Sequence, residues 1–258
     1  MAPLVKELES RTEIQSICCI TAQHRQMLDD VLGLFAITPD YDLDIMEDRQ
    51  SLYTITSKCL LGLEQVFSRE KPDLVLVHGD TSTTFSGALA AFYQKIAVGH
   101  VEAGLRTWDR YSPFPEEMNR TLVGDLASLH FCPTLANREN LLQEGIRDGI
   151  FVTGNTVIDA LKTTVQPAYR FRTDLLNTLD YAGKRVILVT CHRRENYGQP
   201  MENIMGALRR LVEDFPEVEL VYPVHLSPAV QEVAQRHLSN HERIHLIPPL
   251  TPDEMHNL

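Results

Sequence analysis

The sequence of 258 residues has little positive charge. Its 24 Lys and Arg residues are outnumbered by 35 Asp and Glu residues, so the formal net charge is −11. A protein that binds the nucleic-acid backbone needs a basic surface, and this balance therefore excludes a nucleic-acid partner. Anionic small ligands remain possible, because a local group of Arg and His side chains can override the overall sign.

Long apolar runs are missing as well. No run reaches the ~18 apolar residues that cross a bilayer. No basic segment followed by an apolar stretch begins the sequence, so no leader peptide is indicated. We therefore expect a cytoplasmic protein with no membrane partner.

Cysteine is scarce and scattered. The residues form no Cys-x-x-Cys pair and no His/Cys spacing that is typical of zinc, and most lie in or beside apolar runs. Reduced, buried thiols in a cytosolic protein account for them best. We expect no metal site; the five residues are Cys18, Cys19, Cys59, Cys132 and Cys191.

What the sequence does contain is a set of short apolar runs that stop at polar residues. They cover residues 73–78, 96–100, 185–190 and 218–224. Short β-branched runs without alternation are typical of parallel strands buried on both faces. Ligands of open α/β sheets bind beyond the carboxyl ends of the strands, so we expect the functional residues there.

Strand and helix patterns alternate in both halves of the chain, which predicts an α/β fold with doubly wound sheets. A polar stretch without a strand signal separates the halves. We expect an N-terminal Rossmann-like domain over residues 1–165, a linker over 166–184 and a partial C-terminal domain over 185–258. The apolar segment 13–21 is expected to be a strand of the first domain.

Both ends of the sequence look abrupt. The first ten residues have a helical pattern with no strand before it, and residues 253–258 begin a new helix. The second half has only three predicted strands, which is few for a Rossmann-like domain. We therefore expect a fragment that is truncated at both ends and lacks its N-terminal strand and much of its second domain.

A first group of charged residues follows the strands of the N-terminal half. Asp80 follows the run 73–78, Glu102 follows the run 96–100, and Glu116 and Arg120 open a helix four residues apart. Proton abstraction and delivery need several acids, which favours catalysis. Structural roles remain open: Asp80 as a helix cap, Glu102 in an ion pair with Arg106, and Glu116 as a first-turn acid that suits the helix dipole.

A second group follows the strands of the C-terminal half. His192 and Arg193 come after the run 185–190, and His225 comes after the run 218–224. Arginine and histidine beside a strand end suit a phosphate or diphosphate. A solvated loop held by salt bridges is the alternative, and a lone strand-end histidine is more often structural.

These segments together resemble the non-hydrolysing UDP-N-acetylglucosamine 2-epimerases, and the resemblance covers essentially the whole chain. The segments that carry it are TAQHRQMLD, HGDTSTTFSGALAAF, HVEAGLRTWDRYSPFPEEMNR, LHFCPT, VTGNTVIDAL, VTCHRRENYG and VYPVH. The resemblance implies a GT-B-like fold of two Rossmann-like domains, with the site in the cleft between them. It also implies reversible interconversion of UDP-GlcNAc and UDP-ManNAc without NAD or metal.

The family mechanism implies roles for particular residues. UDP leaves C1 as C2 loses its proton, which gives a glycal, and re-addition with protonation on the other face inverts C2. The resemblance implies catalytic roles for Asp80, Glu102, Glu116 and His192, without saying which acid serves which face. It places the substrate against Asp80, Glu102, His192, Arg120, Leu250 and Met255, with Leu250 and Met255 in the uracil pocket.

In some bacterial members a second UDP-GlcNAc binds beside the active site and activates the enzyme. The matching residues are all present here: Gln23, Gln26, Arg49, Glu116, Arg193 and His225. We expect allosteric activation, and the family also suggests a homodimer that serves polysaccharide biosynthesis.

The sequence departs from the family at both ends. It lacks the N-terminal Gly-Thr-Arg-Pro-Glu-Ala loop and the late Asp-Ser-Gly-Gly loop that holds UDP, so we expect this polypeptide alone to be inactive. Three alternatives stay open: a 2-epimerase for a modified UDP-sugar of the diacetamido uronic acid type, a GT-B glycosyltransferase, and an inactive UDP-sugar sensor.

Overall fold

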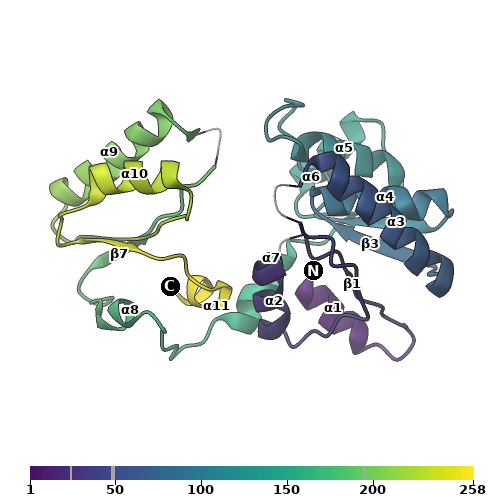
Figure 1. The fold of residues 1–258 in the computed structure, drawn as a ribbon, viewed down its shortest axis with the longest axis horizontal. Helices are drawn as coiled ribbons and strands as arrows, with labels where there is room; N and C mark the ends of the chain where they lie inside the picture. The colour runs from purple at the N-terminus through teal and green to yellow at the C-terminus, as the bar shows by residue number, and fades with distance from the viewer. Residues whose placement is uncertain (24, 48–49, 194–195) are drawn as a thin grey trace. The chain divides into compact units, whose positions relative to one another are not determined.

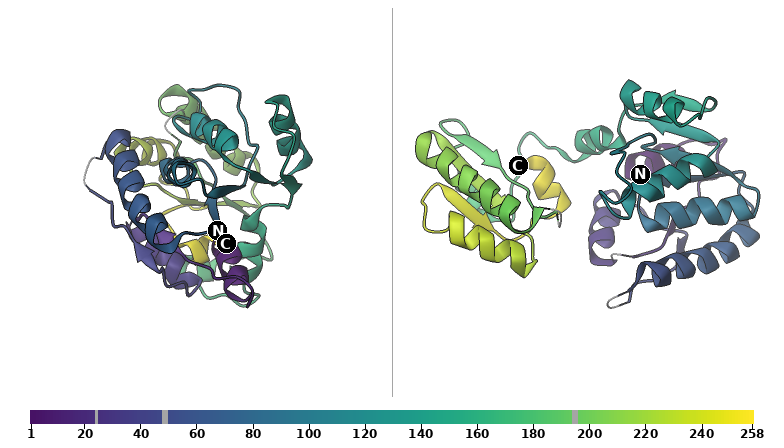
Figure 2. Two further views of the ribbon diagram at one scale, coloured as in Figure 1. Left: turned by 90° about the vertical axis from the view of Figure 1, so that its right-hand side faces the viewer. Right: turned by 90° about the horizontal axis from the view of Figure 1, so that it is seen from above.

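The computed structural model describes residues 1–23, 25–47, 50–193 and 196–258. The chain divides into two compact units, Met1–Thr163 and Thr164–Leu258. Each unit contains a parallel β-sheet and helices (Figures 1 and 2). None of the helices in the described ranges is long and apolar enough to cross a membrane.

The centre of unit 1 is a parallel sheet of four strands in the order β3-β4-β5-β6. The strands are β3 (Leu74–His78), β4 (Ala97–Val101), β5 (Leu129–Cys132) and β6 (Ile150–Val152). In the β3–β4 pairing His78 lies opposite Val101. The last residue of β3 is therefore level with the last residue of β4, and the loops that follow both strands begin side by side.

Unit 1 also contains seven helices in the described ranges. They are α1 (Ala2–Glu9), α2 (Arg25–Leu34), α3 (Leu52–Glu70), α4 (Ser82–Tyr93), α5 (Glu116–Leu126), α6 (Leu135–Gln143) and α7 (Thr156–Thr164). Helix α4 packs against α3, α5 and the sheet, and the small, buried Ala88 and Ala91 allow this close approach. Helix α4 therefore gives the turn after β3 a rigid support.

The segment 13–21, expected to be a strand, is one only over β1 (Cys19–Ile20), which pairs with the equally short β2 (Tyr41–Asp42). A strand needs a partner along its length, and the ladder with β2 has only two paired positions. Ile14 is 44% exposed, so the start of this apolar segment is not buried as in a central strand. The apolar pattern predicted a strand in this segment, and the strand is present but shorter than predicted.

Unit 2 has a parallel sheet in the order β7-β8-β9. Its elements are α8 (Asp174–Thr178), β7 (Arg185–Leu188), α9 (Gln199–Asp214), β8 (Val218–Pro223), α10 (Pro228–Leu238), β9 (Ile244–Ile247) and α11 (Pro252–Asn257). Helices α9 and α10 cover one face of the sheet through the fully buried Met205 and Val230 (Figure 1). The α/β class with parallel sheets, predicted from the apolar runs, is confirmed.

The segment 166–184, for which we expected a linker, belongs to the core of unit 2. Phe171 and Leu176 pack with Val221 and Ile247 on the face of the sheet opposite to α9 and α10. The buried Glu254 of α11 accepts hydrogen bonds from the backbone N–H groups of Arg172 and Thr173 at 2.8 and 3.0 Å. The segment 166–184 has no continuous apolar run of the kind that is typical of a strand, and for this reason its place in the core was not predicted.

Candidate functional site

The candidate site of unit 1 lies at the carboxyl ends of β3 and β4. His78 ends β3, and Glu102 follows the last residue of β4. Their side chains meet: His78 Nε2 is 3.1 Å from Glu102 Oε2. The side chains are 32% and 26% exposed, so the pair is accessible to a ligand.

The turn after His78 places Asp80 in the same group. Gly79 has a φ of 72°, a left-handed conformation that glycine adopts without strain. Thr81 caps α4, since its hydroxyl accepts from the backbone N–H of Thr84 at 3.2 Å. Because Thr81 is the cap, the Asp80 carboxylate is available for another partner.

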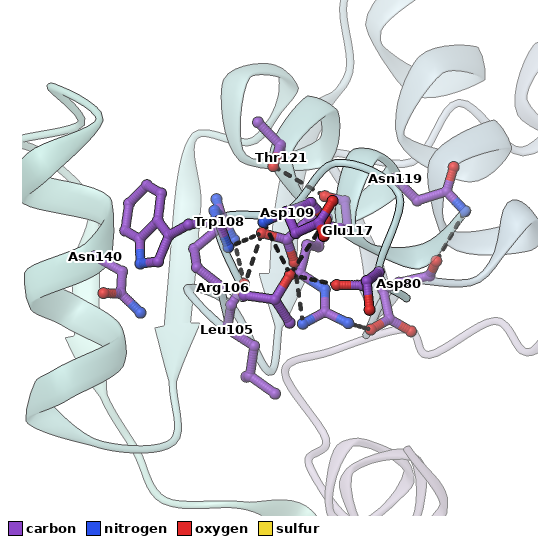
Figure 3. Close-up of polar contacts among 12 residues, drawn as sticks. Asp80, Leu105, Arg106, Trp108, Asp109, Glu117, Asn119, Thr121 and Asn140 are labelled. Carbon is purple, nitrogen blue, oxygen red and sulfur yellow. Dashed lines mark hydrogen bonds and ion pairs between the residues drawn. The ribbon is translucent and has the colours of Figure 1, made fainter. Parts of the chain in front are cut away.

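That partner is Arg120 of α5. Its Nη2 donates to Asp80 Oδ2 at 2.5 Å, and Asn119 Nδ2 donates to the backbone carbonyl of Asp80 at 2.8 Å (Figure 3). Arg120 is 8% exposed. A buried guanidinium and an amide from one helix therefore fix both the side chain and the backbone of Asp80.

Sequence reasoning missed Glu117, which is 3% exposed. Its Oε1 accepts from the backbone N–H groups of Thr107 and Trp108, both at 3.0 Å (Figure 3). Its Oε2 lies 3.6 Å from Arg120 Nη1. The Glu-Glu pair at the start of α5 drew attention to Glu116, and only the three-residue spacing from Glu117 to Arg120 hinted at this contact.

The two acids at the strand ends have opposite electrostatic environments. Burial raises the pKa of Asp80 above its ordinary value, and the carboxylates of Glu116 and Glu102 raise it further, while Arg120 opposes them. The hydrogen bond from His78 lowers the pKa of Glu102, and this effect outweighs the burial of the carboxylate. A site of this kind holds one carboxyl group that keeps a proton more readily and one that loses it more readily.

The backbone at Glu102 is unusual. Glu102 has a φ of 66°, in the left-handed region that residues with a side chain rarely adopt. Gly104 follows with a φ of 85°, and a Cβ there would lie 2.2 Å from the backbone oxygen of Asn137. The tight turn 102–104 thus fits against α6, and the strained residue in it is one of the acids of the site.

Arg106 is not part of this group, and the ion pair with Glu102 that we considered is absent. The side chain of Arg106 is 1% exposed and donates to Glu144 through Nε and Nη2 at 2.7 and 2.6 Å. Its role is to tie the loop after β4 to the end of α6. The side chain that pairs with Glu102 is therefore His78 and not Arg106.

A buried histidine supports the same turn. His100, which is fully buried in β4, lies with Nε2 2.7 Å from the carbonyl oxygen of Gly79. Because a carbonyl only accepts, Nε2 carries the proton and donates. Burial lowers the pKa of His100 to about 4, so the ring is neutral at neutral pH.

Gln23 also lies near the start of α4. The hydroxyl of Thr83 donates to Gln23 Oε1 at 3.3 Å and lies 3.0 Å from the hydroxyl of Thr21. Gln26 lies in the first turn of α2, but its side chain lies outside what the structure describes, and Arg49 lies outside the described residues altogether. Unit 1 therefore brings together Asp80, Glu102, Glu116 and Arg120, with Gln23 beside them.

In unit 2 the second group lies after β7 and β8. The rings of His192 and His225 stack, with centroids 5.2 Å apart and planes inclined by 15°. A pocket of about 370 Å³ is lined by Thr190, Cys191, His192, Arg193, Asn196 and Leu208, among others. Tyr222 of β8 donates to the carbonyl of Cys191 at 2.6 Å and so holds the segment that follows β7 against β8.

Leu250 and Met255 lie elsewhere in unit 2. Leu250 is partly buried against the cluster around Phe171 and Leu176, and Met255 is partly buried on α11. Neither is among the residues that line the pocket beside His192. Among the described residues, no three His, Cys, Asp or Glu side chains are grouped as metal ligands would be.

Comparison with known proteins gives a consistent result. The family model described as UDP-N-acetylglucosamine 2-epimerase matches residues 6–258. A UDP-N-acetylglucosamine 2-epimerase of Bacillus subtilis is 56% identical over 259 residues, which cover 100% of this chain and 67% of the relative. The chain thus spans about two thirds of the length of such relatives.

Solved structures agree with this. A UDP-GlcNAc 2-epimerase of Neisseria meningitidis, bound to UDP-GlcNAc, is 46% identical with a TM-score of 0.88, and the match covers 99% of this chain and 70% of that one. A Staphylococcus aureus protein solved with UDP is 54% identical with a TM-score of 0.89, over 99% and 67% of the two chains. These likenesses confirm the expected GT-B-like α/β fold class.

Proposed function

The chain belongs to the UDP-N-acetylglucosamine 2-epimerase family, and from this premise we propose that it supplies the acids for reversible C2 epimerisation of UDP-GlcNAc to UDP-ManNAc. The observation that carries the proposal is the grouping of Asp80 and Glu102, which follow β3 and β4, with Glu116 at the start of α5. Inversion of a C–H centre needs proton acceptors and donors, and carboxyl groups in unlike environments serve both roles.

The chemistry of the sugar determines the route. The C2 proton is not next to a carbonyl group, so simple deprotonation is unfavourable. In the proposed route one carboxylate takes the C2 proton, the C2–H electron pair forms the C1=C2 bond, and the C1–O bond breaks to release UDP. UDP then adds back to C1 of the glycal while a second carboxyl group protonates C2 from the opposite face.

Unit 1 supplies the groups that this route needs. Asp80 and Glu102 are the candidates for the two proton-transfer groups, and Glu116 shares their electrostatic environment. Arg120 holds Asp80 at 2.5 Å, so Asp80 has a fixed position relative to the turn. A fixed carboxylate position is what efficient proton transfer requires.

In unit 2 we assign the diphosphate to His192 and Arg193. The imidazole is stacked on His225, and Arg193 lines the same pocket. Both offer donors to phosphate oxygens, and charge at the leaving group develops as the C1–O bond breaks. Leu250 and Met255 are proposed to contact the uracil.

We also propose activation by a second UDP-GlcNAc through Gln23, Gln26, Arg49, Glu116, Arg193 and His225. The test is a reverse assay that starts from pure UDP-ManNAc. A lag that added UDP-GlcNAc removes supports activation, whereas a full initial rate without UDP-GlcNAc refutes it.

Proton NMR in deuterated water tests the reaction itself. The chain is joined to the remaining third of the Bacillus subtilis relative, and UDP-GlcNAc is added. We expect the C2 proton signal to disappear and deuterated UDP-ManNAc to form. Tight UDP-GlcNAc binding without C2 exchange would contradict the proposal and favour a sugar-nucleotide sensor. The 258-residue chain, measured alongside, tests the expectation that it is inactive alone.

A further inference from the structure

His78 is in direct contact with Glu102, one of the two proposed proton-transfer groups. Its Nε2 is 3.1 Å from Glu102 Oε2. A carboxylate oxygen accepts but does not donate, so Nε2 carries the proton and donates to Glu102. The hydrogen bond therefore stabilises the ionised form of Glu102 over the protonated form.

The position of His78 is itself well determined. Its backbone belongs to the β3–β4 ladder, opposite Val101. Its carbonyl oxygen accepts from the hydroxyl of Thr84 at 2.5 Å, and the next carbonyl, that of Gly79, accepts from His100 at 2.7 Å. Strand pairing, a helix hydroxyl and a buried histidine together fix the residue that contacts Glu102.

The backbone at Glu102 is held in an unusual conformation between two hydrogen-bonded neighbours: the N–H of Gly79 donates to the carbonyl of Val101 at 3.0 Å, and the N–H of Ala103 donates to the carbonyl of Phe131 at 3.1 Å. Its φ of 66° lies in the left-handed region, where a residue with a side chain is strained. Such a residue persists where its surroundings hold it, and His78 holds its side chain. The strained turn and the hydrogen bond converge on one carboxylate.

We propose that His78 is a positioning residue, which holds the Glu102 carboxylate in one orientation and keeps it ionised so that it can accept the C2 proton. The inference rests on the proposed function for its catalytic consequence, but the pairing of His78 with Glu102 can be tested without it.

Other charged groups also face this carboxylate. Arg120 from α5 and His100 from β4 favour its ionised form. Asp80, from the turn before α4, is a like charge, and the amino group of Met1, from the start of α1, also feels the Glu102 charge. The His78 hydrogen bond is the largest of the influences that lower the pKa of Glu102.

Two substitutions separate positioning from mere folding. His78→Leu removes the donor, whereas His78→Gln keeps an amide N–H near the position of Nε2. In the chain completed with the Bacillus subtilis segment, we expect His78→Leu to lower kcat about 10- to 100-fold with little change in KM, because a hydrogen bond to a charged group is lost. The acid limb of the kcat/KM profile should move to higher pH, and His78→Gln should restore most of both properties.

A matched control is His245→Leu. His245 Nε2 is 2.6 Å from Glu219 Oε1 in unit 2, so this change also breaks a histidine–carboxylate pair, but away from the candidate acids. We expect its kcat and pH profile to stay at the level of the unsubstituted protein. Equal pH profiles for His78→Leu and the unsubstituted protein would overturn the proposal.

Carboxyl ¹³C NMR of the 258-residue chain gives a readout that needs no turnover. The Glu102 signal is assigned by its loss in Glu102→Gln. We expect it to titrate at higher pH in His78→Leu than in the unsubstituted chain, and near the original pH in His78→Gln. An unchanged titration overturns the pairing even if epimerisation is observed, whereas a shifted titration with no epimerisation overturns the proposed function alone.

Discussion

At the scale of single residues, two acids of the same chemical type differ in their environment. Glu102 accepts from a histidine, whereas Asp80 is half-buried among other carboxylates and held by one guanidinium. The difference does not come from the acids themselves, but from the strand ends and the helix that surround them. A pair of acids with unlike proton affinities follows directly from this arrangement.

Glu117 contacts both the backbone of residues 107–108 and Arg120, so its replacement should lower the stability of unit 1. In Glu117→Ala, the backbone N–H groups of Thr107 and Trp108 lose their acceptor, and Arg120 loses a neighbouring carboxylate. We expect the free energy of unfolding of unit 1 to fall by about 3 kcal/mol, as measured by urea titration.

Trp108 makes this measurement specific, because it is the only tryptophan of the sequence and lies in unit 1. Its fluorescence therefore reports unit 1. The control is Glu232→Ala, which removes an exposed ion pair with Arg236 in unit 2 and should leave the Trp108 transition unchanged. A Glu117→Ala transition that coincides with that of the unsubstituted chain would argue against a structural role for Glu117.

The lowered pKa of Glu102 has a consequence for stability against pH. Its pKa in the folded state lies below the ordinary value of 4.5, so its contribution to stability is complete above about pH 4.5 and is lost as the pH falls through the folded-state pKa. The difference in unfolding free energy between the unsubstituted chain and Glu102→Gln should therefore shrink as the pH falls from 6 towards 3.5.

Urea unfolding followed by Trp108 fluorescence across this pH range checks the prediction. Asp80 is the internal contrast, because its pKa is raised and its ionised form costs stability at high pH instead. Asp80→Asn should not reproduce the trend of Glu102→Gln. A constant difference for Glu102→Gln at all pH values would show that His78 does not favour the ionised carboxylate.

At the scale of elements, the turn after β4 depends on one glycine. Gly104 has a φ of 85°, and an added Cβ would lie 2.2 Å from the carbonyl oxygen of Asn137. Gly104→Ala should destabilise unit 1 by about 3 kcal/mol, since a left-handed strain of ~1 kcal/mol adds to the displacement of α6.

Gly79→Ala is the matched control for Gly104→Ala. Gly79 is also left-handed, with a φ of 72°, but a Cβ there meets nothing within 4 Å. Only the backbone strain should remain, so its effect on thermal unfolding should be clearly smaller. Equal losses of stability for the two variants would mean that the contact between the turn and α6 is unimportant.

The strand ends could be predicted from the sequence, because apolar runs that stop at acids and histidines mark the edge of a parallel sheet. The grouping of Asp80 with Arg120 could not, since it depends on how α5 packs beside α4. Arg106 was assigned to Glu102 as one alternative, but its partner Glu144 is 38 residues away in the chain. A contact between residues so far apart in the chain cannot be recognised from the spacing of residues in the sequence.

Two segments differ from what their local sequence predicts. The stretch 166–184 has no strand pattern and was expected to be a linker, yet Phe171 and Leu176 belong to the core of unit 2. The segment 13–21 has the composition of a strand, yet only two of its residues pair. Local composition fails in both cases because the pairing partner lies elsewhere in the chain.

At the scale of the whole molecule, the chain carries a net charge of −11 although its proposed substrate is an anion. The two requirements are compatible because positive side chains are placed locally, with Arg120 in unit 1 and Arg193 in unit 2. Each unit thus carries part of the proposed chemistry: carboxyl groups in unit 1, and imidazole and guanidinium groups in unit 2.

The most direct test measures deuterium uptake from heavy water into each sugar separately. The Asp80→Asn and Glu102→Gln variants of the completed chain are each incubated with UDP-GlcNAc and, in a second reaction, with UDP-ManNAc. Mass spectrometry then measures the deuterium in each sugar. If the two acids act on opposite faces of C2, each variant exchanges the C2 hydrogen of one sugar only, and the two variants label different sugars. We also expect neither variant to form the epimer at more than a small fraction of the unsubstituted rate. Labelling of the same sugar by both variants, or epimerisation at the unsubstituted rate by either, would contradict the assignment of Asp80 and Glu102.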